Sequence, residues 1–424
     1  MTGRTINPTA ETERFQVLDL LRGFALCGIL LANIVAMGQP WSRAYPAFPA
    51  QLTNPDWAAW TLQALFVEGS MRALFTLLFG AGVVLLTAWG ARADRPGTAD
   101  VHFRRAMLLM ALGIGNAVVL LWPGDILYIY GVAAVFLFVF RKLDGRVLVA
   151  LSAMLIAVFS LADAFTDWRA AVALSADPAA HAAAITALTP SAEALNAEAA
   201  VRGSGSYPAI ALWSAGAFTD WALAKGAVLS VGRTVAFMML GMGLFKLGVM
   251  TGARSMRFYL RLAVLGVAGG LAINVWETAT LWRSGFDPAV WTPALTGEVG
   301  RLMLALGYLG AIMAAWKANA LGLIGTGLER MGRMAMTNYL GQSLICAVLF
   351  YGFGLYDRLG WWPLWGLAAA VWVGQALFSA AWLRLFRMGP AEWAFRAVAY
   401  WTVPPLFRPR RPRSDAVAEP APSR

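Results

Sequence analysis

Charged residues are scarce in this chain of 424 residues: Asp, Glu, Lys and Arg together make up 13%, about half the share in soluble domains. Apolar residues make up 59%, and the mean hydropathy is +0.61. This composition excludes an ordinary soluble enzyme, and it excludes a disordered chain, which would be polar and poor in aromatic residues. We therefore interpret the Lys and Arg residues behind the net charge of +11 as loop anchors against an anionic membrane leaflet, not as a nucleic-acid surface.

Cysteine and histidine are also rare, with two residues of each. Cys27 and Cys346 lie in apolar runs without a second cysteine or a histidine at ligand spacing, so we expect no metal site and no disulfide framework. A P-loop and a G-x-S-x-G motif are both missing, and Gly241-Met242-Gly243 falls inside an apolar run, where it cannot open a Rossmann helix. We expect no cofactor.

Long apolar runs dominate the rest of the sequence. A bilayer core of about 30 Å needs about 20 apolar residues per helix. The sequence therefore predicts an all-α fold, a polytopic membrane helix bundle of about ten transmembrane helices. The predicted spans are 16–36, 70–90, 105–122, 125–140, 146–165, 226–248, 258–281, 299–316, 334–353 and 364–386. The first run is not a cleaved signal peptide, because it carries Asp19 and Arg22 and no small-residue cleavage site follows.

Lys and Arg collect in alternate connections, among them 91–105, 141–146 and the segment after 405. By the positive-inside rule this pattern puts both termini in the cytoplasm of a bacterial inner membrane. We expect residues 1–404 to form one transmembrane domain with an Ala-rich, helical, external insertion at 166–206. Residues 405–424, rich in Pro and Arg, are expected to form a disordered basic cytoplasmic tail.

Charged side chains at bilayer depth point to candidate sites, because each costs about 2.5–3.5 kcal/mol and usually faces a partner or a wet cavity. Asp19 and Arg22, three residues apart on one helix face near the inner side, could form a salt bridge that locks the first helix. The other candidates lie in the outer half: Asn33, Glu68, Arg72, Asn116, Asp125, Arg233, Asn274, Glu277 and Arg301. They are compatible with an outward-facing polar cavity and equally with a structural ion-pair network.

Several blocks of sequence carry a family resemblance. They are Arg14 to Ile34 (RFQVLDLLRGFALCGILLANI), 71–75 (MRALF), 78–82 (LFGAG), 122–127 (WPGDIL), 332–339 (GRMAMTNY) and 389–393 (GPAEW). In this combination and order the chain resembles the YeiB-like bacterial inner-membrane proteins, a family of unknown function. That family is distantly similar to membrane acyltransferases of the acyltransferase-3 and heparan-glucosaminide acetyltransferase types. Those enzymes move an acyl group from a cytoplasmic donor to a sugar or lipid.

The resemblance to acyltransferases has one clear departure. Acyltransferase-3 proteins carry a catalytic His about eleven residues after the arginine that matches Arg22, where this chain has Asn33. YeiB-like relatives often have a His in the third span, where this chain has Asn116. Neither asparagine can act as a general base.

Two functional hypotheses follow, and a scaffold without a ligand stays open as a third. The first is a binding or transport protein that holds a small polar or amphipathic molecule in the outward-facing cavity. The second is an acyltransferase in which Asp125, Glu277 or Glu68 deprotonates an acceptor hydroxyl, while Arg22 or Arg72 holds an anionic acyl donor. The expected partners are membrane lipids and a small-molecule or acyl-donor ligand, with no nucleic acid and with the oligomeric state open.

Overall fold

The computed structural model describes residues 15–41, 54–88, 97–188 and 191–408. Within these ranges the regular structure is helical, apart from one isolated bridge between Phe386 and Phe407, which confirms the predicted all-α class. The helices are α1 (Gln16–Gly38), α3 (Asn54–Phe66), α4 (Ser70–Thr87), α5 (Thr98–Val118), α6 (Leu127–Leu137), α7 (Gly145–Ala176), α8 (Pro178–Leu188), α9 (Ala192–Arg202), α10 (Tyr207–Leu223), α11 (Lys225–Lys246), α12 (Met256–Arg283), α13 (Thr292–Lys317), α14 (Gly322–Arg333), α15 (Ala335–Ala347), α16 (Trp361–Leu385) and α17 (Pro390–Tyr400).

Seven helical segments in the described residues are long and apolar enough to cross a bilayer: α1, Pro55–Thr87 (α3 with α4), α7, α11, α12, α13 and α16. Each coincides with a predicted span. The other three predicted spans are helical but do not meet this criterion. The α5 helix carries His102, Arg104 and Arg105 in its first turns, and α6 has only 11 residues before a 3₁₀ turn at Phe138–Lys142. The third, 334–353, is α15 followed by a π-helical turn at Val348–Gly352.

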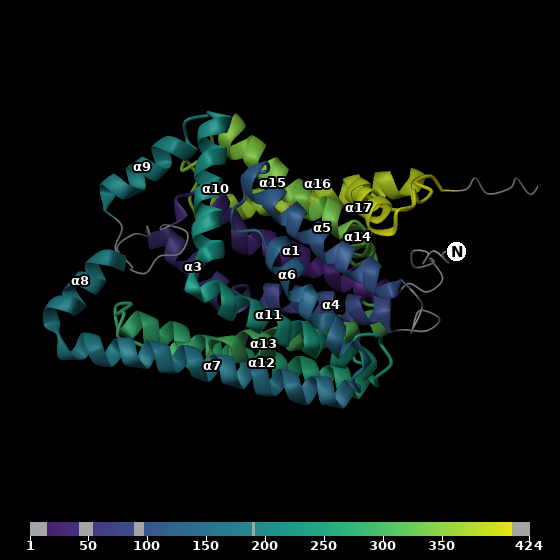
Figure 1. Ribbon diagram of the computed structural model, residues 1–424, viewed down its shortest axis with the longest axis horizontal. Coiled ribbons are helices and arrows are strands. Elements are labelled where there is room, and N and C mark those ends of the chain that lie inside the picture. The colour runs from purple at the N-terminus through teal and green to yellow at the C-terminus, as the bar shows by residue number, and fades with distance from the viewer. Residues whose placement is uncertain (1–14, 42–53, 89–96, 189–190, 409–424) are drawn as a thin grey trace, which may run out of the picture.

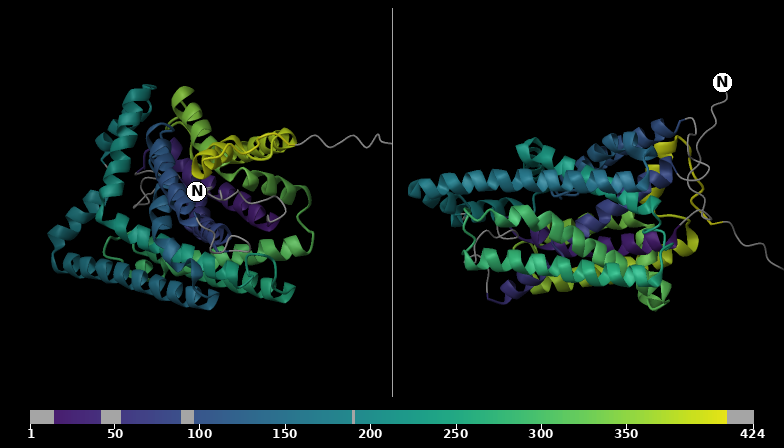
Figure 2. Two further views of the ribbon diagram at one scale, coloured as in Figure 1. Left: turned by 45° about the vertical axis from the view of Figure 1, so that its right-hand side comes forward. Right: turned by 90° about the horizontal axis from the view of Figure 1, so that it is seen from below.

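The helices pack lengthwise as a bundle (Figures 1 and 2). In Figure 1 the helices α7, α12 and α13 run along the lower edge, and α1, α4, α5 and α14 to α17 lie above them. Buried side chains such as Leu77, Leu148, Met238, Tyr259 and Leu309 join α4, α7, α11, α12 and α13 into one apolar core. This core therefore joins α7, α12 and α13 to the helices that lie above them in Figure 1.

The two ends of the bundle differ in chemistry. At one end, where α1 begins and α17 lies, Lys246 Nζ donates to the carbonyl oxygens of Arg141 and Leu143, and Lys317 Nζ donates to that of Gly252. We call this the basic end. The opposite end, which we call the far end, holds the C-terminus of α1, the N-terminus of α16 and helices α8 and α9. The lysines that end α11 and α13 thus lie at one end of the bundle.

The described residues of the segment expected to form a helical insertion, 166–206, are mostly helical. Its first part continues α7 to Ala176, and α8 and α9 follow, while α10 adds a helix that the sequence analysis does not single out. At one point α8 is tethered to the α12–α13 connection, where His181 Nε2 lies 2.8 Å from Asp287 Oδ1. The hydrogen bonds from the Ala289 amide and from His181 lower the pKa of Asp287, so this carboxylate remains ionised at neutral pH.

This tether gives a local prediction. We expect His181→Ala to release α8 without disturbing the bundle, because both partners are about a third exposed and a pair of this kind contributes little to global stability. Limited proteolysis should cut 177–191 faster in the variant, with an unchanged melting temperature. An unchanged cleavage rate would show that the contact does not hold α8.

Of the predicted tail 405–424, residues 409–424 lie outside the described residues, as do Arg92 and Arg95 of the 91–105 connection. Residues 405–408 are described, and Arg408 N donates to the carbonyl oxygen of Leu385. The division into one transmembrane domain, an external insertion and a tail stays a prediction.

Candidate functional site

A cavity of about 620 Å³ lies at the basic end, bounded by α1, α4, α5, α6, α14, α15 and α17 and by residues 387–388 and 402–405. Its volume falls in the range of about 300–1,000 Å³ that is typical of small-molecule sites. Five arginines line it, and we call it the basic pocket after them. They are Arg22, Arg105, Arg333, Arg387 and Arg396.

The arginines come from five parts of the fold: α1, α5, α14, the connection between α16 and α17, and α17. Arg22 Nη1 donates to Asp19 Oδ1 at 3.0 Å, the salt bridge expected from their spacing. The guanidinium of Arg105 lies over the ring of Phe395, 5.1 Å from its centroid. The Nε atom of Arg387 is buried and has no hydrogen-bond partner among the described residues. A buried N–H of this kind calls for an acceptor.

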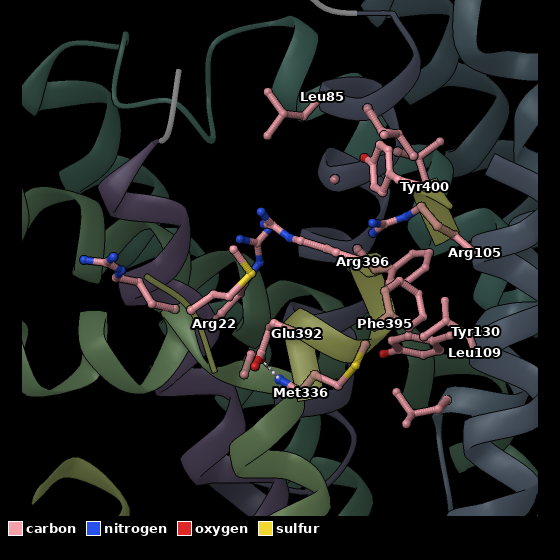
Figure 3. A pocket seen from close by; sticks show the side chains of 18 of the residues that line it. Arg22, Leu85, Arg105, Leu109, Tyr130, Met336, Glu392, Phe395, Arg396 and Tyr400 are labelled. Atoms are coloured by element: carbon pink, nitrogen blue, oxygen red, sulfur yellow. Dashed lines mark hydrogen bonds between the residues drawn. The ribbon is translucent and has the colours of Figure 1, made fainter. Parts of the chain in front are cut away.

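Much of the remaining wall of the basic pocket is apolar. Phe75 and Phe79 of α4, Leu109 of α5 and Phe395 of α17 contribute to it. Figure 3 shows Arg105 and Arg396 beside Phe395, and Tyr130 and Leu109 close together next to them. The pocket thus joins a cationic region to an aromatic and aliphatic one.

Glu392 is the one carboxylate among the described lining residues, and its oxygens are already in use. Its Oε1 accepts hydrogen bonds from the amides of Met336 (2.7 Å) and Thr337 (3.1 Å), and its Oε2 accepts one from Thr337 Oγ1 (2.5 Å) (Figure 3). Glu392 therefore caps the N-terminus of α15, where the helix breaks away from α14 at Met334. Burial raises the pKa of Glu392 above 4.5, and the hydrogen bonds from Thr337 and Met336 oppose this shift.

The inner part of the pocket leads to a buried carboxylate. Tyr339, which lines the pocket, donates from its hydroxyl to Asp125 Oδ1 at 3.0 Å. Asn116 Nδ2 donates to the same oxygen at 2.8 Å, and the Tyr128 amide donates to Oδ2 at 2.9 Å. The structure thus brings the predicted residues Asn116 and Asp125 together, across the turn that follows Pro123.

We expect Asp125→Ala to destabilise the protein by about 1–3 kcal/mol, because it leaves three buried donors without an acceptor. Tyr339→Phe removes one donor and keeps the ring, so its effect should be about 0.5–1.5 kcal/mol. Thermal unfolding in detergent, followed by tryptophan fluorescence, measures both. Equal melting temperatures for the wild type and Asp125→Ala would contradict the assignment.

A second group of predicted residues meets in the far half of the bundle. Glu298 Oε1 lies 3.7 Å from Arg72 Nη2 and 3.4 Å from Arg301 Nη1. Glu277 of the neighbouring helix α12 accepts a hydrogen bond from Thr296 Oγ1 at 2.6 Å. These contacts are those of an ion-pair network, one of the two alternatives left open by the sequence.

Two other predicted residues make contacts of their own. Asn274 Nδ2 donates to the carbonyl oxygen of Leu65 at 2.9 Å and ties α12 to α3. Arg233 pairs with Asp163 of α7, a partner that the sequence analysis does not name. Asn33 and Glu68 are half-buried. The outward-facing cavity stays a prediction, because of the eleven candidate residues only Arg22 lines the basic pocket.

Sequence reasoning missed most of the basic pocket. It counted Arg105 and Arg333 as loop anchors, and it quoted Glu392 only within a family block. One signal was present: Glu392, Phe395, Arg396 and Tyr400 recur at positions i, i+3, i+4 and i+8, the spacing of one helix face. That face of α17 covers the pocket.

Comparisons with known proteins cover nearly the whole chain. A family model described as "Protein of unknown function (DUF418)" matches residues 244–402. The uncharacterized protein YeiB of Escherichia coli (strain K12) is 32% identical over 400 residues, which cover 91% of this chain and 96% of that protein. The uncharacterized protein YxaH of Bacillus subtilis (strain 168) is 27% identical over 434 residues, covering 95% and 98%. No solved structure matches the chain.

Proposed function

The chain belongs to the family of YeiB, and from the basic pocket we propose that it is an inner-membrane protein that binds a small anionic amphipathic molecule. The observation that carries the proposal is the joining of five arginines to an apolar wall in one cavity. A guanidinium cluster favours an anionic group. Phe75, Phe79 and Leu109 suit a short hydrocarbon portion of the same molecule, because burying apolar surface is favourable.

The proposal includes an orientation. The basic end faces the cytoplasm, as the positive-inside rule predicts for the lysines and arginines gathered there. The α5 helix, α6 with its 3₁₀ turn, and α15 with its π-helical turn complete ten crossings, and both termini then lie inside. The ligand reaches the pocket from the cytoplasm or from the inner leaflet. Labelling of single cysteines placed at 255 and at 205 with a membrane-impermeant maleimide tests this orientation, since position 205 alone should react in intact cells.

Ligand binding is tested with matched amphiphiles. Octanoate should raise the melting temperature of the protein in dodecyl maltoside, and neutral octyl glucoside at the same concentration should not. The double variant Arg105→Gln/Arg396→Gln should lose this response. Arg257→Gln is the matched control, because Arg257 is an exposed arginine of α12 at the same end and does not line the pocket. An equal response in all three proteins would refute the proposal.

Acyl transfer is the second candidate function, and the position of the basic pocket favours it. A cytoplasmic acyl donor would need a cavity near Asp19 and Arg22, and Arg22 lines the pocket. Asp125, which Tyr339 links to the pocket, is the carboxylate placed to serve as a base. Profiling the lipids and glycans of a deletion strain tests this candidate, since an acyltransferase leaves a missing acyl mark and a binding protein does not.

A further inference from the structure

His102 is a buried imidazole on the wall of the basic pocket that the proposed function does not use. It lies near the start of α5, is 3% exposed and lines the cavity. Its Nε2 lies 2.8 Å from the carbonyl oxygen of Ala134 on α6. The ring packs beside the rings of Phe103 and Phe138, whose centroids are 5.5 and 5.2 Å away. These contacts hold the imidazole in one orientation.

The contact with Ala134 settles which ring nitrogen carries the proton. A carbonyl oxygen can only accept a hydrogen bond, so Nε2 donates, and in the neutral ring Nδ1 is then an acceptor. An imidazole with an ordinary pKa of about 6.5 is neutral at pH 7.5. Among the residues that the structure describes, none donates a hydrogen bond to Nδ1. The tie between α5 and α6 therefore uses one nitrogen, and the other calls for a donor from outside the chain.

Arg105 lies next to this acceptor. His102 and Arg105 are three positions apart on α5, and both line the pocket. Residues at this spacing share a helix face, with Cβ atoms about 5–6 Å apart. The guanidinium supplies cationic donors, whereas the imidazole supplies an acceptor. A ligand that satisfies both has to carry a hydrogen-bond donor within a few bonds of its negative group.

We propose that the ligand of the basic pocket carries an uncharged hydrogen-bond donor, a hydroxyl or an amide N–H, near its anionic group, and that His102 Nδ1 accepts from this donor. The inference rests on the proposed function, which requires only an anionic amphipathic molecule. An ammonium group does not fit this position, because Arg105 on the same helix face would repel it. Hydroxy fatty acids and N-acyl amino acids have the required arrangement.

Two pairs of ligands isolate the donor. 3-Hydroxyoctanoate differs from octanoate by one hydroxyl, and N-hexanoylglycine has an N–H where N-hexanoylsarcosine has an N-methyl group. By calorimetry in dodecyl maltoside at pH 7.5, the member with the donor should bind about fivefold more tightly in at least one pair, which is the effect of one net hydrogen bond. Without an acceptor in the pocket octanoate should bind the more tightly of the first pair, because burying an unpaired hydroxyl is costly.

Two variants at position 102 separate the acceptor from the structural contact. His102→Gln keeps an amide N–H for the carbonyl oxygen of Ala134 but has no acceptor at the position of Nδ1, and His102→Phe lacks both groups. The preference for the donor should disappear in both variants, while His102→Gln should keep the melting temperature and the octanoate affinity of the wild type. Arg257→Gln should leave the preference unchanged.

The outcomes distinguish this inference from the proposed function. Binding of octanoate with no preference for either donor, or a preference that survives in His102→Gln, would overturn the role of His102 and leave the anion-binding function standing. Binding of none of the ligands, or binding that Arg105→Gln/Arg396→Gln leaves intact, would overturn both. A preference that depends on His102 in the first pair assigns a hydroxy acid, one in the second pair assigns an acyl amide, and either supports the inference.

Discussion

Gly332→Ala should cost the protein about 3 kcal/mol or more of stability, because a methyl group at this position has no room. A Cβ built on Gly332 would lie 1.8 Å from the carbonyl oxygen of Asp19 and 2.8 Å from the amide nitrogen of Gly23. Both contacts are to backbone atoms, so no side-chain rotation relieves them and α14 must move away from α1. Overpacking of a tight contact typically costs about 1–3 kcal/mol, and a displaced helix adds lost packing.

Gly327→Ala on the same helix is the matched control. Nothing lies within 4 Å of a Cβ built there, so the substitution should stabilise α14 by about 0.5–1 kcal/mol through helix propensity alone. Yield of monodisperse protein and the melting temperature in dodecyl maltoside measure both variants. The close approach of α1 to α14 would be contradicted if the two alanine variants melted at the same temperature.

The parts of the fold that could be predicted are those that composition alone determines. Apolar runs of about 20 residues predicted the seven long helices. In lipid the backbone hydrogen bonds must close within each segment, so an apolar composition alone indicates a spanning helix. The break between α14 and α15 was not predictable from hydropathy. It depends on Glu392, 58 positions beyond Met334 in the chain, whose carboxylate satisfies the amides at the start of α15. A cap supplied from so far away leaves no local signal.

The candidate site residues also divide into those that the sequence predicts and those that only the fold brings together. Asp19 with Arg22, three positions apart on one helix, was predictable from spacing and is confirmed as a contact. Arg72 and Arg301 were recognised as costly charges, and the structure supplies their shared partner, Glu298. The basic pocket was not predictable, because arginines near the inner side also satisfy the positive-inside rule and their sequence positions do not separate an anchor from a ligand contact. The convergence of α1, α5, α14 and α17 in the fold shows it.

Arg202 at the far end illustrates a charge that the sequence analysis passed over, and it carries the second large expected effect. Its side chain is completely buried, although it lies in a segment that looks like a polar insertion. Its Nη1 donates to Glu198 Oε1 at 2.9 Å, and its Nη2 donates to the Tyr351 hydroxyl at 2.7 Å. It also donates to the carbonyl oxygens that end α1, at Ala36 (3.2 Å), Met37 (3.4 Å) and Gln39 (3.3 Å).

We expect Arg202→Met to destabilise the protein by about 3–5 kcal/mol, the cost of removing one partner from a buried ion pair. The change removes the cation paired with Glu198, which keeps hydrogen bonds from the Trp41 amide and the Tyr356 hydroxyl. It also removes the donor to three carbonyl groups at the C-terminus of α1, so the loss should fall at the far end first. Amide hydrogen exchange should rise across 192–207 and 351–357 while α12 and α13 keep their protection. Arg169→Met, at an exposed position of α7, should change stability by less than about 0.5 kcal/mol. A uniform rise in exchange, or equal melting temperatures for the two variants, would show that Arg202 does not clamp α9 to α1.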